Sequence, residues 1–406
     1  MIESRFIEKL LNGREVEWKH LGDIASYIRG LTYTKNNESP NNEGYKILRA
    51  NNITLSNNTL NLDDIKIVKF DTKVKENQKL YKNDILISAA SGSREHVGKV
   101  AFITADLDYY FGGFMGVIRC VNDVNPRYVF HILTSDLFQN YLNEVLNSST
   151  INNLNSKVME AFFVPIPPLD VQQEIVRILD AFTSLTAELT AELTSRQKQY
   201  QYFKEHLLNI NNNIVWKSLS EITITTKNIK WENNKKNYRY IDLTSVNREN
   251  NRITETIEIN AKNAPSRAQK IIEKNDILFA TTRPTQQRMT IVPEEYDSQI
   301  ASTGYCVLRP NKEEVLPEWI YYNISTIDFK NYVEEYQSGS AYPAISDYKV
   351  KEYKIPIPSI QMQEKLISIL NRFEELTHSI EAGLPNEIQL RKQQYEYYRN
   401  MLLNFK

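Results

Sequence analysis

The apolar residues of two long segments recur at alternating intervals of four and three residues. In the first segment this spacing runs without interruption from Val171 to Leu189. It is typical of the buried seam of a coiled coil, so each segment is predicted to form a long helix, roughly 60 Å for about forty residues. The first seam is Val171, Ile175, Ile178, Phe182, Leu185, Leu189, Leu193, Arg196, Tyr200, Phe203 and Leu207. The second is Met362, Leu366, Ile369, Phe373, Leu376, Ile380, Leu384, Ile388, Arg391, Tyr395, Tyr398 and Leu402.

The first seam is interrupted where the word TAEL is written twice, at residues 186–189 and 190–193. There two consecutive steps of four residues, from Leu185 to Leu189 and from Leu189 to Leu193, replace the alternation of four and three. The second segment has an additional step of four near residues 382–385, where Gly383 and Pro385 predict a kink or a break. Because a helix rises by about 1.5 Å per residue, we interpret the TAEL repeat as a unit that sets a length.

Most of the chain is repeated once. The matched pairs are WKHLGDI (18–24) with WKSLSEI (216–222), QKLYKNDILIS (78–88) with QKIIEKNDILFA (269–280), VPIPPLDVQQEIVRILDAF (164–182) with IPIPSIQMQEKLISILNRF (355–373), and RQKQYQYFKEHLLN (196–209) with RKQQYEYYRNMLLN (391–404). A third echo, RFIEKLLN at 5–12, resembles the end of each copy. The start of the chain therefore looks like the end of a repeat, as in a circular arrangement that has been cut.

Outside the long segments, short apolar runs alternate with turn residues, as in KNDIL at 82–86 and 274–278. This pattern predicts mixed α/β domains. If the two long helices pair, the connections require them to run antiparallel, with one globular domain at each end, in a pseudo-twofold α+β fold. The predicted parts are a first domain over 1–168 (with 5–12 completing the helical region), a spacer helix over 169–210, a second domain over 211–358, and a second spacer helix over 359–406.

Composition is that of an ordinary globular protein, with 41% hydrophobic and 24% charged residues and a net charge of −1. The chain has no long apolar run and no signal-peptide pattern at its start, and Cys120 and Cys306 are too few for a disulfide framework. We therefore expect a cytoplasmic protein that does not enter a membrane. With a net charge near zero, any DNA-binding charges must be segregated on one face.

No catalytic or metal-binding constellation is visible in the sequence. The histidines and cysteines lack zinc-site spacing, and neither a Walker loop nor the Asn/Asp-Pro-Pro-aromatic motif of amino-methyltransferases occurs. YFGGFMG (110–116) lacks dinucleotide-binding spacing and is interpreted as a tight strand turn in the core. We expect a non-catalytic chain that itself binds no cofactor and no metal.

The repeated motifs resemble the specificity subunits of type I restriction–modification systems, the HsdS family. The resemblance covers essentially the whole chain and is carried by PIPPLDVQQEIVRILDAF, TAEL, RQKQY, QEKLISIL, GLPNEI and RKQQYEYYR. It implies two target-recognition domains, each reading one half of a bipartite asymmetric site in double-stranded DNA. It also implies that the helices set the spacer and dock two methyltransferase (M) subunits. Those partners would bind S-adenosylmethionine and methylate adenine, and restriction/translocase (R) subunits would join for cleavage.

Candidate DNA-binding residues lie in three pairs of regions at matching positions of the two copies, where polar groups could read bases and cations could contact phosphate. The first pair follows the KNDIL strands and contains Ser91, Ser93, Arg94, His96 and Lys99 in one copy and Thr282, Arg283, Thr285, Gln286, Gln287 and Arg288 in the other. The second pair precedes the Pro-Ile-Pro segments and contains Thr150, Asn152 and Asn153, and Ser340 and Tyr342. The third pair, with the weakest signal, contains Arg49 and Asn51, and Arg248. For the first pair the alternative is an ordinary solvated loop, and for the second it is a segment that closes the domain onto its helix.

Two tyrosines of the long helices are candidates for contacts with a partner protein. Tyr200 and Tyr395 fall on the seam, whereas Tyr202 and Tyr397 fall outside it, where a partner helix could pack.

Two rival functions keep the repeat and the helices. A coiled-coil interaction protein with two protein- or glycan-binding heads would show no salt-dependent affinity for DNA. An autonomous DNA enzyme would transfer a methyl group from S-adenosylmethionine without any partner.

Overall fold

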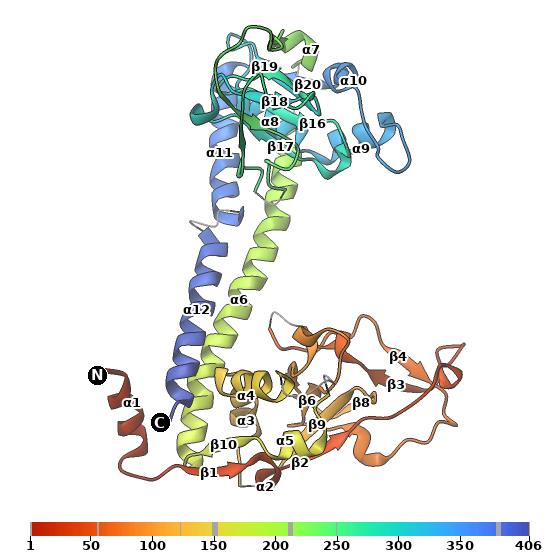
Figure 1. Cartoon of the computed structure of the whole chain (residues 1–406), viewed down its shortest axis with the longest axis vertical. Helices are drawn as coiled ribbons and strands as arrows, with labels where there is room; N and C mark the ends of the chain where they lie inside the picture. The colour runs from red at the N-terminus through yellow and green to blue at the C-terminus, as the bar shows by residue number, and fades with distance from the viewer. Residues whose placement is uncertain are drawn as a thin grey trace. The chain divides into compact units, whose positions relative to one another are not determined.

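The computed structural model describes residues 2–54, 57–121, 123–147, 153–209, 214–248, 250–378 and 383–405. The chain divides into two compact units. Unit 1 comprises residues 1–188 and 389–406, and unit 2 comprises residues 189–388. Both contain sheets and helices, which confirms the predicted α+β class (Figure 1).

Unit 1 contains two four-stranded sheets and one strand pair. The first sheet has the order β2 (Ala25–Arg29), β9 (Met115–Cys120), β6 (Ile85–Ser88) and β7 (Val100–Phe102). The second has the order β4 (Lys66–Val68), β3 (Tyr45–Leu48), β8 (Leu107–Phe111) and β5 (Lys79–Leu80). The pair consists of β1 (Glu17–His20) and β10 (Phe163–Ile166). All neighbours are antiparallel except β3 and β8.

Unit 2 repeats this topology strand for strand. Its sheets have the orders β12 (Thr223–Ile224), β19 (Tyr305–Pro310), β16 (Ile277–Ala280), β17 (Met289–Ile291), and β14 (Ile257–Ile259), β13 (Tyr238–Ile241), β18 (Ile300–Ser302), β15 (Ala268–Ile271). Its strand pair is β11 (Val215–Ser218) with β20 (Lys354–Ile357). Even the register is kept, because Trp18 lies opposite Pro165 in unit 1 and Trp216 lies opposite Pro356 in unit 2. The sequence repeat is therefore a repeat of topology.

The repeated word KNDIL has a structural cause in both units. Asn83 and Asn275 have left-handed backbones, with φ of 73° and 72°, a conformation that asparagine tolerates better than most residues. The next residue, Asp84 or Asp276, is buried and accepts hydrogen bonds from an arginine on the neighbouring strand. Arg119 Nη2 lies 2.7 Å from Asp84 Oδ2, and Arg309 Nη2 lies 2.8 Å from Asp276 Oδ2. The turn and the ion pair together fix where the central strand begins.

Short helices complete each unit. In unit 1 they are α1 (Ile2–Leu11), α2 (Leu21–Ile24), α3 (Pro126–Leu133), α4 (Asp136–Asn147) and α5 (Ser156–Glu160), with 3-10 turns η1 (Lys35–Asn37), η2 (Ala50–Asn52), η3 (Glu76–Gln78) and η4 (Arg94–His96). In unit 2 they are α7 (Leu219–Ile222), α8 (Pro317–Ile324), α9 (Ile327–Tyr336) and α10 (Asp347–Glu352), with η5 (Pro284–Gln286) and η6 (Glu294–Tyr296).

The long helices are α6 (Leu169–Leu208), α11 (Ile360–His378) and α12 (Gly383–Leu403). In unit 1 the first half of α6 packs on the last turns of α12, where Phe182 stacks on Tyr398 with ring centroids 5.2 Å apart. In unit 2 the second half of α6 packs on α11, where Phe203 stacks on Phe373 at 5.8 Å. Within each unit, taken by itself, the two paired helices run antiparallel. In unit 1, Ile7 of α1 joins the same core cluster.

The predicted seam is only partly correct. Leu185, Phe203, Met362 and Leu376 are exposed, and Ile380 lies outside the described residues. The buried positions of α6 instead follow steps of four at each end. They are Val171, Ile175 and Leu179, with the buried Gln172 beside them, then Tyr200, Lys204 and Leu208. The first and last turns of α6 pack on the globular part of their unit as well as on another helix. An apolar face that contacts two neighbours is wider than the seam of a two-helix coiled coil.

The second long segment is two helices. α11 ends at His378 and α12 begins at Gly383, whose φ of +74° is left-handed. A β-carbon there would lie 2.6 Å from the carbonyl oxygen of Glu375, so only glycine fits this corner without displacement. The break predicted from Gly383 and Pro385 is present.

Candidate nucleic-acid interface

In unit 1, the structure brings together two of the three regions proposed to contact DNA. The loop after β6 and the segment before α5 are joined because Leu154 N–H donates to Ala89 O at 2.7 Å and Ala90 forms a β-bridge with Asn153. Arg29 of β2 supports this junction, since its Nη1 lies 3.2 Å from Asn153 Oδ1 and its Nη2 lies 2.8 Å from Gly113 O. The Asn153 side chain is therefore held by an arginine.

Within the loop after β6, Ser93 and Arg94 are exposed, whereas Ser91, His96 and Lys99 are half-buried. Arg94 Nη2 lies 3.4 Å from Asn143 Oδ1, a long contact, and the side chain is exposed to solvent. The positions of Thr150 and Asn152 lie outside the described residues.

The same two regions meet in unit 2. Arg283 N–H donates to Pro343 O at 2.7 Å, Ile345 N–H donates to Thr281 O at 2.9 Å, and Thr282 forms a β-bridge with Ala344. The Arg283 guanidinium lies 5.1 Å from the ring centroid of Tyr342, a cation–π contact. Tyr342 is 71% exposed, so its other face is available.

The remaining side chains of this loop differ in their surroundings. Gln286 and Ser340 are exposed, while Thr282, Thr285 and Arg288 are half-buried. Gln287, expected to contact DNA, instead donates from Nε2 to the carbonyl oxygen of Thr326 at 3.2 Å. Its amide holds η5 on the connection between α8 and α9, so its geometry fits a structural role better than the predicted one.

The third pair of regions gives a mixed result. Arg49 Nη2 and Asn51 Nδ2 both donate to Asp64 Oδ2, at 2.8 Å and 2.9 Å, so one carboxylate already binds both groups. Arg248 is exposed. The turn between β8 and β9 connects the region around Arg49 with the loop after β6. Gly112 N–H in this turn donates to Leu48 O, and the carbonyl oxygen of Phe114 accepts from the N–H groups of Ala89 and Ala90.

That turn corrects one prediction. Phe111 and Met115 of YFGGFMG are fully buried, as a core turn requires, but Phe114 is 73% exposed. Sequence reasoning missed this residue as a surface group, and the signal that could have found it is the Gly-Gly pair immediately before it.

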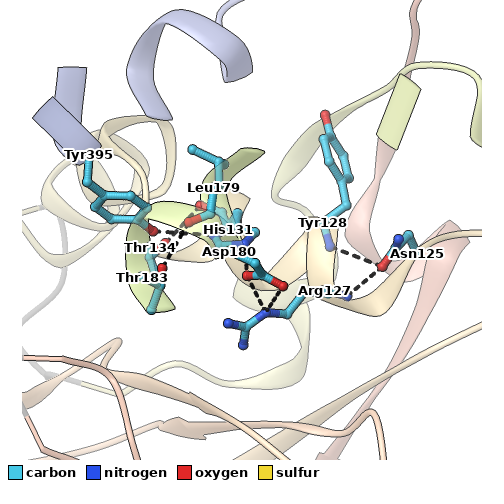
Figure 2. A network of polar contacts seen from close by, with 9 residues as sticks. All are labelled: Asn125, Arg127, Tyr128, His131, Thr134, Leu179, Asp180, Thr183 and Tyr395. Atoms are coloured by element: carbon cyan, nitrogen blue, oxygen red, sulfur yellow. Dashed lines mark hydrogen bonds and ion pairs between the residues drawn. The ribbon is translucent and has the colours of Figure 1, made fainter. Parts of the chain in front are cut away.

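A buried polar joint holds the globular part of unit 1 on its helices (Figure 2). His131 of α3 is fully buried, with Nε2 2.9 Å from Asp180 Oδ1 on α6 and Nδ1 3.3 Å from the Tyr395 hydroxyl on α12. Arg127, one turn earlier on α3, donates from Nε to the same carboxylate at 2.9 Å. Three elements therefore meet at one imidazole.

The joint has defined electrostatics. Burial lowers the pKa of His131, outweighing the opposite effect of its hydrogen bond with Asp180. Burial raises the pKa of Asp180, but the hydrogen bond from His131 and the charge of Arg127 outweigh it and lower that pKa. The imidazole is thus neutral, with Nε2–H donating to an ionised carboxylate.

Unit 2 builds the same joint from different residues. At the positions of His131 and Asp180 it has Tyr322 and Asn371, and the Tyr322 hydroxyl lies within hydrogen-bonding distance of two acceptors, Asn371 Oδ1 and Glu374 Oε2. Lys204 of α6 is buried and donates to Ser325 O at the end of α8, at 2.9 Å. The scaffold is repeated while the chemistry of the joint is not.

Comparison with known proteins identifies the family. The sequence model of the type I restriction modification DNA specificity domain matches residues 14–196 and 212–390, which is one match for each copy of the repeat. The chain belongs to this family. The specificity subunit of the type I restriction enzyme EcoR124I/EcoR124II of Escherichia coli is 29% identical over 435 aligned positions, covering 100% of this chain and 98% of that one. A putative specificity subunit of Haemophilus influenzae is 27% identical, covering 98% of each chain.

Solved structures of similar fold come from work on type I restriction–modification systems. One, from work on complex assembly and conformational transition of the type I restriction–modification system, has a TM-score of 0.64 at 14% identity, covering 97% of this chain and 98% of that one. The S subunit from M. genitalium has a TM-score of 0.53 at 14% identity, covering 97% and 98%. At this identity the likeness concerns the fold.

In this member of the specificity family, the exposure of the helical tyrosines follows the predicted separation of seam residues from outward-facing residues, most clearly for Tyr200 and Tyr202. Tyr200 is buried and Tyr395 half-buried, whereas Tyr202 and Tyr397 are exposed. Tyr202 stacks on His206 with ring centroids 6.1 Å apart, which forms a flat aromatic surface on α6.

The described residues offer little reactive chemistry. Burial raises the pKa of both Cys120 and Cys306 to about 12, so neither thiol is a ready nucleophile. Over the described ranges, no group of three or more His, Cys, Asp or Glu residues is arranged to hold a metal ion. Among the helices that the structure describes, none combines the length and apolarity needed to cross a bilayer.

Proposed function

We propose that this chain is the DNA specificity subunit of a type I restriction–modification complex, and that each unit reads one half of a bipartite asymmetric site. The single observation that carries this is the contrast between scaffold and loops. The strand order, the register and the buried Asp–Arg pairs are the same in both units. The exposed loop at the same place differs, with Ser93 and Arg94 in one unit and Arg283 and Gln286 in the other.

The proposal assigns the remaining tasks to partners. Two M subunits dock on the long helices, with Tyr202 and Tyr397 among the contacts, and they bind S-adenosylmethionine and methylate adenine. R subunits join the complex for translocation and cleavage. The chain itself is a non-catalytic cytoplasmic reader of double-stranded DNA. The family match and the solved assembly of a related system support this division of labour.

The test uses the repeat. The full chain is co-expressed with its M subunit in cells, and methylated adenines are mapped across the genome. In a second chain, residues 215–357 are replaced by residues 17–166, with both cuts made in the matched strand pairs β1–β10 and β11–β20. The wild type should methylate an asymmetric bipartite motif, and the duplicated chain should methylate an inverted repeat of the half-site that unit 1 reads.

The reciprocal chain, with the unit 2 segment in both places, is the control and should give the other inverted repeat. A duplicated chain that methylates the unchanged asymmetric motif would contradict the proposal. Methyl transfer by the purified chain alone would instead favour an autonomous enzyme, and DNA binding insensitive to salt would remove the electrostatic basis of recognition.

A further inference from the structure

The turn that carries Phe114 is fixed on every side. Met115 N–H donates to Gly112 O at 2.7 Å and closes a four-residue β-turn, with Phe114 at its third position. Leu31 N–H donates to Phe111 O, and Gly30 approaches so closely that a β-carbon on it would lie 2.1 Å from Gly112 O. On the other side, Ala89 N–H and Ala90 N–H both donate to Phe114 O, at 2.8 Å and 3.0 Å.

The ring of Phe114 is nevertheless 73% exposed. A rigid backbone therefore presents an apolar side chain to solvent, with little conformational freedom to lose on binding. Unit 2 keeps the turn but not the ring. Gly304 stands at the position of Phe114, and its carbonyl oxygen accepts the matching hydrogen bond, from Thr281 N–H at 2.8 Å. The backbone hydrogen bond forms with glycine at this position as well, so it does not account for the phenylalanine ring in unit 1.

The turn lies where the proposed DNA-reading segments meet. Ala89 and Ala90 open the loop that carries Arg94, and Arg29 bridges Gly113 O to Asn153 Oδ1. Resting on the proposed function, we propose that Phe114 is a wedge that stacks on a base at one step of the half-site read by unit 1, partly unstacking that step. Exposed apolar rings beside cationic and polar side chains are a recurrent means of opening a base step.

DNA fits this surface better than a protein partner does. The turn binds Ala89 and Ala90, which open the loop that carries the exposed Arg94, and an exposed guanidinium suits phosphate. The segment lies on the globular part of the unit. Unit 2 presents its own exposed aromatic residue at the corresponding junction, Tyr342, on which Arg283 stacks. Each unit thus offers one flat ring beside an arginine, but from a different hairpin, as expected for readers of different sequences.

The test uses the complex of the full chain with M subunits and duplexes containing the mapped target, in which 2-aminopurine replaces one base at a time. Fluorescence of 2-aminopurine rises when the base loses its stacking. We expect a rise at one step of the unit 1 half-site with the wild type and none with Phe114→Ala. Affinity should fall by about 5- to 150-fold, which corresponds to about 1–3 kcal/mol for stacking of one base on an aromatic ring, and by the same factor at low and high salt.

Phe114→Trp should restore both signals, and Phe70→Ala is the matched control. Phe70 is 66% exposed in the same unit, but its ring packs on Tyr45 instead of lying on the turn. If Phe114→Ala binds and perturbs 2-aminopurine as the wild type does, the wedge is refuted while the proposed function stands. If the wild-type complex recognises no DNA target, the proposed function fails and this inference fails with it.

Discussion

His131 and Tyr322 occupy equivalent places at the joint between a globular part and its helices, yet only the histidine has an ordinary pKa, 6.5, near neutral pH. His131 has a pKa lowered from 6.5 by burial, and the charged or titratable groups around it are Asp180, Arg127, Arg399 and Tyr395. Burial raises the pKa of Tyr322 above its usual 10. Both joints hold a globular part on its helices, but we expect only the stability of the His131 joint to depend on pH in the acidic range.

We expect acid to weaken unit 1 through His131. Because the folded-state pKa is depressed, the unfolded chain binds more protons as pH falls through 6.5. The stabilisation is thus fully present above pH 6.5 and is lost progressively below it. In His131→Gln, an amide can still donate to Asp180 and accept from Tyr395 but cannot titrate. The stability difference between wild type and variant, measured by urea unfolding from pH 7.5 to 5.5, should shrink as the pH falls.

Tyr322→Phe is the control for this experiment. Tyr322 does not titrate in that window, so removal of its hydroxyl should cost the same stability at every pH. A His131→Gln difference that stays constant over the range would show that the imidazole contributes only its shape.

Two arginines of unit 1 separate DNA contact from folding. Arg94 is exposed, so Arg94→Ala should leave unfolding unchanged and reduce the slope of log affinity against log salt by about 1, the value for one lost phosphate contact. Arg119 pairs with the buried Asp84, so Arg119→Ala should cost about 3 kcal/mol of stability, because a buried carboxylate loses its partner. Filter binding at several salt concentrations and thermal unfolding distinguish them. An unchanged salt slope for Arg94→Ala would remove it from the interface.

At the scale of elements, each long helical segment is tied to its globular part by one buried glutamine. Gln172 Oε1 accepts from Asn125 N–H at 3.0 Å, and its Nε2 donates to Pro167 O at 2.8 Å. Gln363 does the same in unit 2, with Leu316 N–H and Pro358 O. Both glutamines are almost fully buried, so these bonds have no competition from water.

We expect Gln172→Leu to destabilise unit 1 by about 2 kcal/mol, because a buried N–H and a buried carbonyl lose their partners. Gln173 is exposed on the same turn, so Gln173→Leu is a matched control and should be nearly neutral. Hydrogen exchange at the Asn125 amide should quicken in the first variant only. Equal stability of the two variants would show that the glutamine does not hold the helix.

These glutamines also show where a pattern of apolar residues stops being informative. Gln172 and Gln363 stand at equivalent positions of the repeat, but a spacing of four and three does not show that they are buried. The same spacing assigned Leu185 to the interior and missed Lys204. KNDIL was more informative, because turn chemistry and a strand are local properties. The pairing of Arg49 with Asp64 and the exposure of Phe114 depend on tertiary contacts that no short-range spacing encodes.

At the scale of the molecule, the internal repeat was the strongest signal in the sequence. It predicted two similar α+β units, which the strand orders confirm, because a repeated core requires the same buried positions twice. It could not predict which loop residues face DNA. Loops at equivalent positions diverge where they recognise different ligands, so the repeat is weakest where function is most specific.

The TAEL repeat lies in a stretch of α6 that contributes no fully buried side chain to either core. From Asp180 to Gln199 no residue of the helix is fully buried, and the boundary between the units falls at Glu188. Thr186 and Thr194 bond back to carbonyls one turn earlier, which keeps their side chains on the helix itself. Four more residues inserted here should therefore leave both cores intact, and the variant should unfold as the wild type does.

We expect a third TAEL after Leu193 to lengthen the unspecified spacer of the DNA site and to leave both half-sites unchanged. Four residues add about 6 Å of helix and a net rotation of about 40°. Length alone corresponds to about two base pairs at 3.4 Å each, whereas rotation corresponds to about one, at roughly 35°. We favour one base pair, since bending absorbs a few ångströms but a wrongly rotated unit loses its base contacts. In methylation maps, replacement of one TAEL by AAKL should keep the original spacer, because the helix length is the same. An insertion that leaves the spacer unaltered would contradict the role of α6 as a ruler.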